Sequence, residues 1–192
     1  MSPRTKEQFQ DIRLERKQQI LEAALEVFAM NGYHKASISH IAKEANISKG
    51  LLYNYFDNKE KLLLDVMKDG INYLLRGYGQ QSNSPAKDQL KKMIIDSFDF
   101  MDEDQRHWRL YFSTMIQTEV QQLVMEKLME SLMPVFENLA SIFGQLGFKE
   151  PFMEARIFGA MLDGLGMNYL LDGENFPKDY CINRLLEIYH LV

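Results

Sequence analysis

Residues 37–62, SISHIAKEANISKGLLYNYFDNKEKL, decide the fold. They predict two short helices joined by a tight turn, followed by the start of a third helix. Ser37 precedes the first helix, where its side-chain oxygen can accept from a free backbone N–H. Asn46 occupies the turn, and Asn tolerates the positive φ that a sharp reversal needs. The first helix has one narrow apolar face, because its apolar residues recur at i, i+3, i+4 and i+7: Ile38, Ile41, Ala42 and Ala45.

The second helix of this stretch presents a polar outer face. Ser48 can cap the helix, and Leu52 and Phe56 form an i,i+4 apolar pair on its inner side. Two helices joined by a turn of a few residues, with a polar outer face on the second, make a helix-turn-helix. The second helix of such a pair is narrow enough to enter the major groove of DNA.

The same residues resemble the DNA-binding signature of the tetracycline-repressor (TetR) family of bacterial regulators. The resemblance extends upstream through residues 20–28, ILEAALEVF, and covers about the first third of the chain. Two positions depart from the family pattern: Asn46 stands where Gly is common, and Leu51 where a small or hydroxyl residue is common. The matching residues are Ile38, Ile41, Ala42, Ala45, Ile47, Ser48, Lys49, Gly50, Tyr53, Tyr55, Phe56 and Lys59, with Asn31, Gly32 and Tyr33 before them.

The resemblance implies which residues meet DNA, and their chemistry agrees with that role. A Lys can reach a guanine edge or a phosphate, Asn can pair with adenine, and a Tyr hydroxyl can contact a phosphate. The alternatives are a solvated surface for His40 and Lys43, and packing against the helix-turn-helix core for Tyr55. The predicted DNA-binding residues are Ser39, His40, Lys43, Ser48, Lys49, Gly50, Tyr53, Asn54, Tyr55 and Lys59.

Charge is unevenly distributed along the 192 residues. Residues 1–61 contain 10 Lys/Arg and 8 Asp/Glu (+2), and residues 62–192 contain 12 and 19 (−7), for a net charge of −5. The acidic remainder discourages the body from lying on phosphates. The single cysteine, Cys181, excludes an internal disulfide and fits the reducing cytoplasm, where we expect the protein. No apolar run reaches about 18 residues, so we expect no membrane span.

Helical periodicity continues along the rest of the chain and predicts an all-α fold of about nine helices. Outside the helix-turn-helix we expect helices near residues 11–30, 58–76, 85–101, 104–118, 119–143, 151–171 and 177–191. Pro134 should kink or split the helix that contains it. Residues 77–85, GYGQQSNSP, are typical of a linker. We divide the chain into a helix-turn-helix DNA-binding domain, residues 1–60, and a helical ligand-binding and dimerisation domain, residues 61–192.

The body is rich in Met and Phe, with twelve of each in the chain. Flexible thioethers and flat rings can line an adaptable apolar pocket, and the TetR resemblance implies that the body senses a small molecule there. The alternative for any one of these residues is ordinary core packing. The candidate pocket residues are Phe98, Met101, Trp108, Phe112, Met115, Met129, Met133, Phe136, Phe158 and Met161.

Glycines inside the predicted helix 151–171 indicate close helix packing. An interior Gly weakens a helix by about 1 kcal/mol relative to Ala, a cost that close approach of another helix can offset. We expect the last two helices to pair with their copies about a twofold axis. The alternative is that the glycines pack within one chain. The candidate dimer residues are Gly159, Leu162, Gly166, Tyr169, Ile182, Leu185 and Tyr189.

The sequence contains no recognisable catalytic motif. The four histidines are scattered, and neither a phosphate-binding Gly loop nor a nucleophile motif is present. We expect no catalytic residue, metal or cofactor. The sequence favours a ligand-responsive, dimeric transcriptional regulator, a repressor released from a palindromic operator when a small molecule binds. The alternatives are a DNA-binding protein of this fold with an architectural role and no sensing, and an all-α carrier or enzyme.

Overall fold

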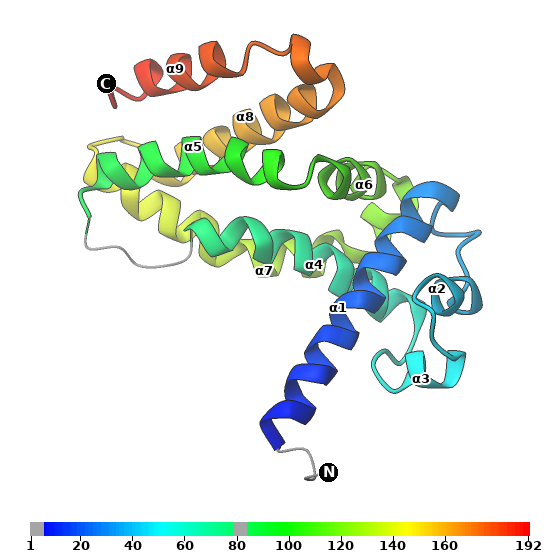
Figure 1. Cartoon of the computed structure of the whole chain (residues 1–192). Coiled ribbons are helices and arrows are strands. Elements are labelled where there is room, and N and C mark those ends of the chain that lie inside the picture. Colours follow the sequence, from blue (N-terminus) through cyan, green and yellow to red (C-terminus); the bar gives the residue numbers. More distant parts are fainter. Residues whose placement is uncertain (1–5, 79–83) are drawn as a thin grey trace. The chain divides into compact units, whose positions relative to one another are not determined.

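The computed structural model describes residues 6–78 and 84–192, with side chains described for residues 7–72 and 84–192. These residues form nine α-helices and one 3₁₀ turn, without a strand, which confirms the all-α prediction (Figure 1). Residues 79–83 of the predicted linker lie outside the described residues. The elements are α1 (Lys6–Asn31), α2 (Ile38–Glu44), α3 (Lys49–Tyr53), α4 (Lys59–Tyr78), α5 (Ala86–Glu103), α6 (Gln105–Met115), α7 (Thr118–Gln145), α8 (Pro151–Asp172), η1 (Gly173–Asn175) and α9 (Lys178–Ile188).

The described chain divides into two compact units. Unit 1 comprises the residues up to Gly70 together with Leu110–Leu128, and unit 2 comprises Ile71–Arg109 and Met129–Val192. Unit 1 therefore contains the helix-turn-helix and also the segment around the α6–α7 turn. The predicted functional domains, 1–60 and 61–192, differ from these units and stay a prediction.

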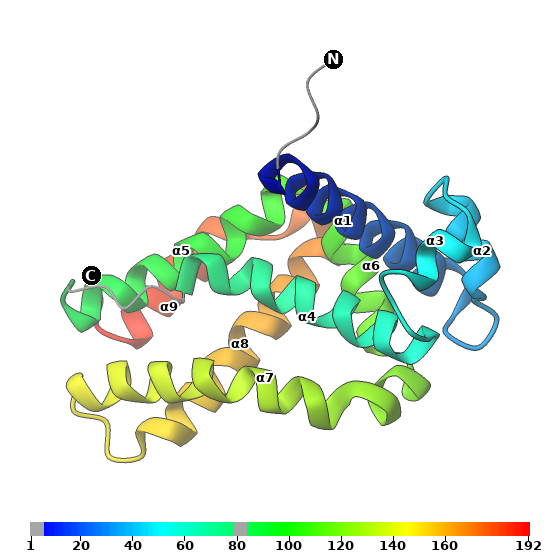
Figure 2. The ribbon, with the colours of Figure 1, turned by 90° about the horizontal axis from the view of Figure 1, so that it is seen from below.

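Unit 1 begins with a long helix whose inner face is apolar. Ile20, Ala24 and Phe28 of α1 are buried, at the i, i+4 spacing that puts them on one face. The helix stops at Gly32, which has φ 74°, a conformation that Gly adopts without strain. In Figure 2, α2 and α3 lie beside one another near the C-terminal end of α1.

Unit 2 is held together by the packing of α5 against α8 and α9, with the second half of α7 (Figure 1). Its core contains a group of aromatic side chains, in which the rings of Phe158 and Tyr189 have centroids 5.5 Å apart and those of Phe143 and Phe158 5.6 Å apart. Aromatic pairs at such separations add to the stabilisation from burial. The core residues are Leu90, Met93, Ile94, Leu139, Ile142, Phe143, Ala155, Phe158, Leu185, Leu186, Tyr189 and Leu191.

Pro134 lies inside α7 without splitting it, because the helix runs unbroken from Thr118 to Gln145. Of the two predicted outcomes, a kink or a split, the split does not occur. A proline removes one i→i−4 hydrogen bond, to the carbonyl of Glu130 here. Both Pro134 and Glu130 are exposed, so water can satisfy that carbonyl and the interruption costs less than it would in a core.

None of the helices in the described part of the chain combines the length and the hydropathy needed to cross a bilayer.

Candidate DNA-binding surface and helical body

The helix-turn-helix is fixed by local hydrogen bonds at both of its helix starts. The hydroxyl oxygen of Ser37 accepts from the backbone N–H of His40 at 3.1 Å, and that of Ser48 accepts from Leu51 at 3.1 Å. Asn46 adopts φ 52°, the left-handed conformation expected for the turn. The caps and the turn predicted from the sequence are present, and they set the direction in which α3 leaves α2.

The inner face of α3 is anchored in the core of unit 1. Leu52 is fully buried and Phe56, just after the helix, is 1% exposed. Burying side chains of this size stabilises a fold by about 1.5–3 kcal/mol each. Because α3 has only five residues, this anchor and the Ser48 cap hold it in place.

The outer face of α3 is exposed and polar. Lys49, Gly50 and Asn54 are exposed, and Tyr53 is 45% exposed. The Lys49 ammonium lies 5.9 Å from the centre of the Tyr53 ring, so the two side chains occupy the same face. Ser39, His40 and Lys43 of α2 are exposed as well, and a shallow depression between the helices is lined by Ser39, Lys43, Ser48 and Lys49 among others. This surface offers cationic and hydrogen-bonding groups on one side.

Lys59 and Tyr55, which are predicted to bind DNA, contact residues far from them in the sequence. The Lys59 ammonium donates to the carbonyls of Tyr33 at 2.8 Å and Ala36 at 3.0 Å, and it lies 4.2 Å from the centre of the Tyr33 ring. Burial lowers the pKa of the Lys59 ammonium. The pKa of the Tyr33 hydroxyl is raised, mainly by burial and to a smaller extent by the negative charge of Glu60. Tyr55 is half-buried, with the Arg13 guanidinium 5.5 Å from its ring centre. Contact of Lys59 and Tyr55 with DNA stays a prediction.

The predicted ligand-pocket residues are distributed over both units. Phe112 and Met115 belong to unit 1, and the other eight belong to unit 2. Phe98, Met101, Trp108 and Phe158 are buried, and the Trp108 indole donates to the carbonyl of Phe100 at 3.0 Å. Met129, Phe136 and Met161 are half-buried, and Met133 is exposed. That these residues line one ligand site stays a prediction.

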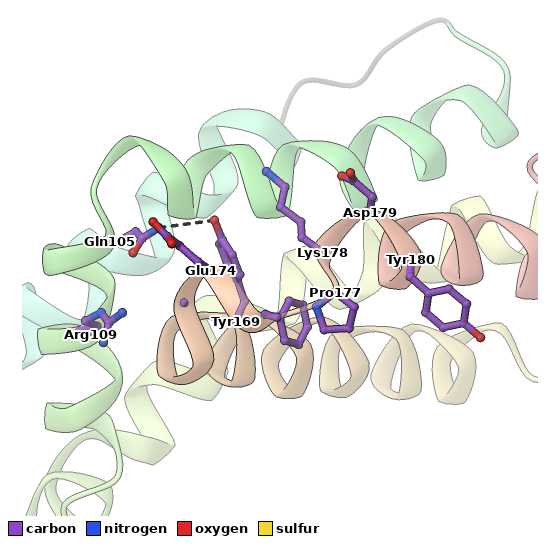
Figure 3. Close-up of a pocket in the computed structure, with 10 residues that line it drawn as sticks. Gln105, Arg109, Tyr169, Glu174, Pro177, Lys178, Asp179 and Tyr180 are labelled. Atoms are coloured by element: carbon purple, nitrogen blue, oxygen red, sulfur yellow. Dashed lines mark hydrogen bonds between the residues drawn. The ribbon is translucent and has the colours of Figure 1, made fainter.

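Unit 2 contains an open pocket of about 730 Å³ where α6, α8 and the η1–α9 segment meet (Figure 3). None of the predicted pocket residues lines it. Its walls are mixed in character, with Arg109 and Lys178 as cations, Glu174 and Asp179 as carboxylates, and Tyr169 and Tyr180 as aromatics. Such a pocket can take a polar or charged group more readily than an apolar chain.

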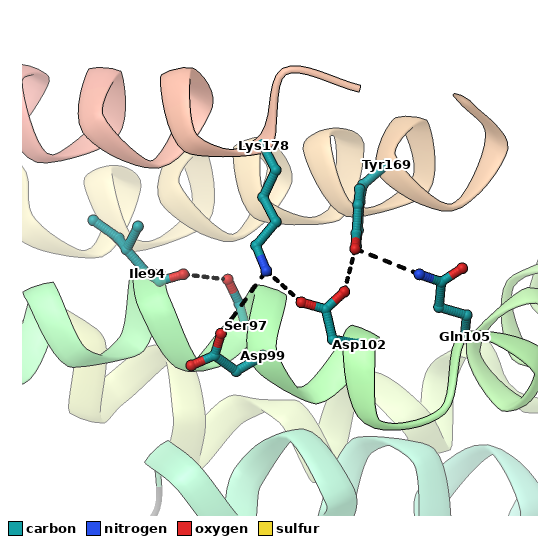
Figure 4. Close-up of polar contacts among 7 residues, drawn as sticks. All are labelled: Ile94, Ser97, Asp99, Asp102, Gln105, Tyr169 and Lys178. Carbon is teal, nitrogen blue, oxygen red and sulfur yellow. Dashed lines mark hydrogen bonds and ion pairs between the residues drawn. The ribbon is translucent and has the colours of Figure 1, made fainter. Parts of the chain in front are cut away.

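A polar network joins four helices beside this pocket (Figure 4). Asp102 of α5 accepts from the Tyr169 hydroxyl of α8 and from the Lys178 ammonium of α9. Gln105 of α6 donates to the Tyr169 oxygen at 3.4 Å. Burial alone would raise the pKa of Asp102, but the hydrogen bonds from Lys178 and Tyr169 outweigh it and hold the pKa below its ordinary value. The network therefore favours an ionised Asp102.

Several predicted dimer residues pack inside their own protomer. A Cβ on Gly166 would lie 2.3 Å from the Met101 Cε, so this glycine makes room for a neighbour within the chain. Leu185 and Tyr189 are buried in the unit 2 core, and the Tyr189 hydroxyl donates to Glu154 at 3.0 Å. Tyr169 is engaged in the polar network, and Gly159, Leu162 and Ile182 are half-buried. Gly166, Leu185 and Tyr189 are therefore buried within their own protomer, and the dimer interface stays a prediction.

The apolar residues that α8 does expose were not among the predicted dimer residues. Met153, Ile157, Met167 and Leu171 are each at least 38% exposed. With Ala160 and Gly164 between them, they recur every three or four residues and so form one stripe along the helix. The sequence signal was present, but α8 is apolar on several sides and periodicity did not show which side faces inward.

Comparison with known proteins agrees with the helix-turn-helix geometry. The family model "Bacterial regulatory proteins, tetR family" matches residues 20–66, which include α2, α3 and their caps. Residues 20–66 therefore match the DNA-binding domain of the TetR family. A relative of this chain, the HTH-type transcriptional activator FasR of Mycolicibacterium smegmatis, is 36% identical over 109 residues, which are 56% of this chain and 50% of FasR. The chain spans about half the length of the first curated relatives it matches.

Solved structures share the fold of this chain over nearly its whole length. FadR of Bacillus subtilis, solved in complex with stearoyl-CoA, has a TM-score of 0.69 and 24% identity, covering 90% of this chain and 96% of FadR. AibR, solved with isovaleryl coenzyme A and operator DNA, has a TM-score of 0.71 and 18% identity, covering 90% and 97%. At these identities the similarity shows the fold.

Among the described residues, no group of three or more His, Cys, Asp or Glu side chains is placed to hold a metal ion.

Proposed function

We propose that this chain is a TetR-family regulator of transcription, ligand-responsive and sequence-specific in DNA binding, that acts in the cytoplasm as a homodimer. The observation that carries the proposal is the outer face of α3. Lys49, Tyr53 and Asn54 project from a short helix that is capped by Ser48 and anchored by Leu52. A preorganised helix with an exposed cation, hydroxyl and amide suits base and phosphate contacts in a major groove.

The dimer supplies the second recognition helix. Two such helices enter successive major grooves when they lie roughly 34–36 Å apart, so the target is a palindromic duplex. We propose the exposed stripe of α8 as the surface between copies, since apolar side chains along one helix face are otherwise left in water. An added Cβ at Gly164 would meet no neighbouring side chain within 4 Å. This open space would allow close approach of the α8 helix of the second copy.

Size measurement in solution tests the dimer. Replacing Ile157 with Glu puts a charge in the stripe and is expected to convert the dimer to monomer in sedimentation velocity experiments. The same change at Gln122, exposed on α7, is the control and should leave the dimer intact. A dimer that survives Ile157→Glu assigns the interface to another surface.

The effector class that we propose is an acyl-coenzyme A thioester. FadR and AibR, which share the fold, were solved with stearoyl-CoA and isovaleryl coenzyme A. In this chain, the rings and thioethers of the body suit an acyl chain, and the pocket with Arg109 and Lys178 suits a charged group. The ligand shifts DNA binding only if its affinity differs between the DNA-bound and free geometries.

The sign of regulation that we propose is repression, with release on ligand binding. The FasR relative is named an activator. Activation of transcription by this chain would therefore contradict the proposed repression. We propose no enzymatic activity, since the relatives are named as regulators.

The deciding experiment uses duplexes selected by the full-length protein from a random pool. Binding to the selected duplex, followed by fluorescence anisotropy, should weaken at least about tenfold with stearoyl-CoA or isovaleryl-CoA, a typical allosteric coupling. Free coenzyme A is the ligand control and a scrambled duplex is the DNA control. Failure to select any duplex would rule out sequence-specific recognition.

A second candidate is a DNA-binding protein of the same fold with an architectural role and no sensing. The complete burial of Trp108 and the burial of Phe98 and Phe158 favour it, because these residues then serve only as core. Specific DNA binding that no acyl-CoA alters would support this second candidate.

A further inference from the structure

Gln117, in the turn between α6 and α7, uses both ends of its side-chain amide on backbone groups of the DNA-binding head. Its Nε2 donates to the carbonyl of Phe28 at 3.0 Å, and its Oε1 accepts from the backbone N–H of Tyr33 at 3.0 Å. These partners lie 89 and 84 residues away along the chain, on either side of the point where α1 ends at Gly32. All of these residues belong to unit 1.

Tyr33 also contacts Lys59, which connects the loop to the helix-turn-helix. Its carbonyl and its ring are both held by the Lys59 ammonium, which also binds the carbonyl of Ala36. The residue after Ala36 is Ser37, the cap of α2. The loop between α1 and α2 is therefore fixed from one side by Gln117 and from the other by the start of α4.

The Gln117 amide pairs with one backbone donor and one backbone acceptor at the same time. A side-chain amide can satisfy one donor and one acceptor at once. Removing it leaves the Tyr33 N–H without an acceptor and takes one donor away from the Phe28 carbonyl. The Phe28 carbonyl also accepts from the Gly32 N–H at 3.0 Å, so Tyr33 is the group that depends on Gln117 most.

We propose that Gln117 is a positioning residue for DNA recognition: it sets the α1–α2 loop, and through it the placement of α2 and α3, without itself contacting DNA. This inference rests on the proposed function. Loss of the amide should loosen the loop and spread the orientations of α3, which weakens specific contacts. Non-specific binding depends on phosphate charge and should change little.

The test compares Gln117→Leu, which removes both hydrogen bonds, with Gln117→Glu, which keeps the acceptor for Tyr33 but loses the donor. Gln121→Leu, at an exposed Gln one turn along α7, is the matched control. Amide hydrogen exchange is measured on the full-length protein without DNA, and affinity is measured for a wild-type-selected duplex and its scrambled version.

For Gln117→Leu we expect faster exchange at Tyr33 and at Leu51 of α3, and a specific-to-scrambled affinity ratio lowered about tenfold, in line with two lost hydrogen bonds. Gln117→Glu should protect Tyr33 and retain more of the ratio, and Gln121→Leu should match wild type. A ratio within twofold of wild type for Gln117→Leu, or unchanged Leu51 exchange, overturns the proposal. If Gln117→Leu does not fold, the same criteria are applied to Gln117→Ala, which also removes both hydrogen bonds.

The exchange measurement separates this inference from the proposed function. If the wild-type protein selects no duplex, the proposed function fails, while the exchange at Tyr33 and Leu51 still decides whether Gln117 positions α3.

Discussion

The helix-turn-helix and α8 carry the two surfaces to which function is assigned, and they are built in opposite ways. In the helix-turn-helix, two serine caps and a positive-φ Asn46 fix short helices whose outward groups are polar. In α8, 22 residues are apolar on several sides, and the outward stripe around Ile157 resembles the inward face around Phe158 in composition. Local hydrogen bonds define the first surface, whereas only packing separates inside from outside in the second.

The largest expected effect comes from the adjacent residues Phe158 and Ile157. Phe158 is 1% exposed and Ile157 is 53% exposed. Phe158→Ala should lower the free energy of unfolding by about 3–5 kcal/mol, because it leaves a cavity in the aromatic core. Ile157→Ala should lower it by under about 1 kcal/mol. Urea denaturation at two protein concentrations separates unfolding from dissociation. Equal losses at the two positions would contradict the assignment of inner and outer faces.

The next effect concerns DNA and the outer face of α3. Lys49→Ala should weaken binding to the selected duplex by about tenfold and lower the slope of log affinity against log salt by about 1 per protomer, as expected for a lost phosphate contact. Lys91→Ala, at an exposed Lys of α5, should leave both quantities unchanged. An unchanged salt slope with reduced affinity would instead assign Lys49 to a base edge.

A smaller effect tests how far α3 depends on its cap. Ser48→Ala removes the acceptor for the Leu51 N–H and should lower the free energy of unfolding by about 1 kcal/mol. Ser48→Asp should keep that stability, since Asp caps as well as Ser. Ser39→Ala, at an exposed Ser inside α2 and away from its cap, should stay within about 0.5 kcal/mol of wild type in the same urea titration.

The smallest effect belongs to the polar network of unit 2. Because the pKa of Asp102 is lowered in the folded protein, the contribution of its ionised form is complete above the ordinary carboxyl pKa of about 4 and is lost as the pH falls through the lowered value. Asp102 is exposed, so Asp102→Asn should cost under about 1 kcal/mol at neutral pH. The difference between the variant and wild type should shrink on acidification. A difference that is independent of pH would show that the charge of Asp102 contributes nothing.

Sequence reasoning worked best where the deciding interactions are local. The caps at Ser37 and Ser48, the turn at Asn46 and the buried Leu52 each depend on residues within a few positions, so spacing alone predicted them. It did not predict the hydrogen bonds from Lys59 to two carbonyls more than 20 residues away, and contact of Lys59 with DNA stays a prediction. It also missed Gln117, because nothing near that residue in the sequence marks its partners.

Neighbouring residues were enough to predict the all-α class, the helix-turn-helix and the polar outer face of α3, since helical periodicity and end caps are local properties. The folded chain was needed to show that Gly166, Leu185 and Tyr189 face their own core while Met153 and Ile157 face outward. It was also needed to show that Gln117 holds the loop before α2. The physical reason is that burial and side-chain hydrogen bonds between distant segments depend on which helix faces meet. A helix that is apolar on several sides leaves that choice to its neighbours.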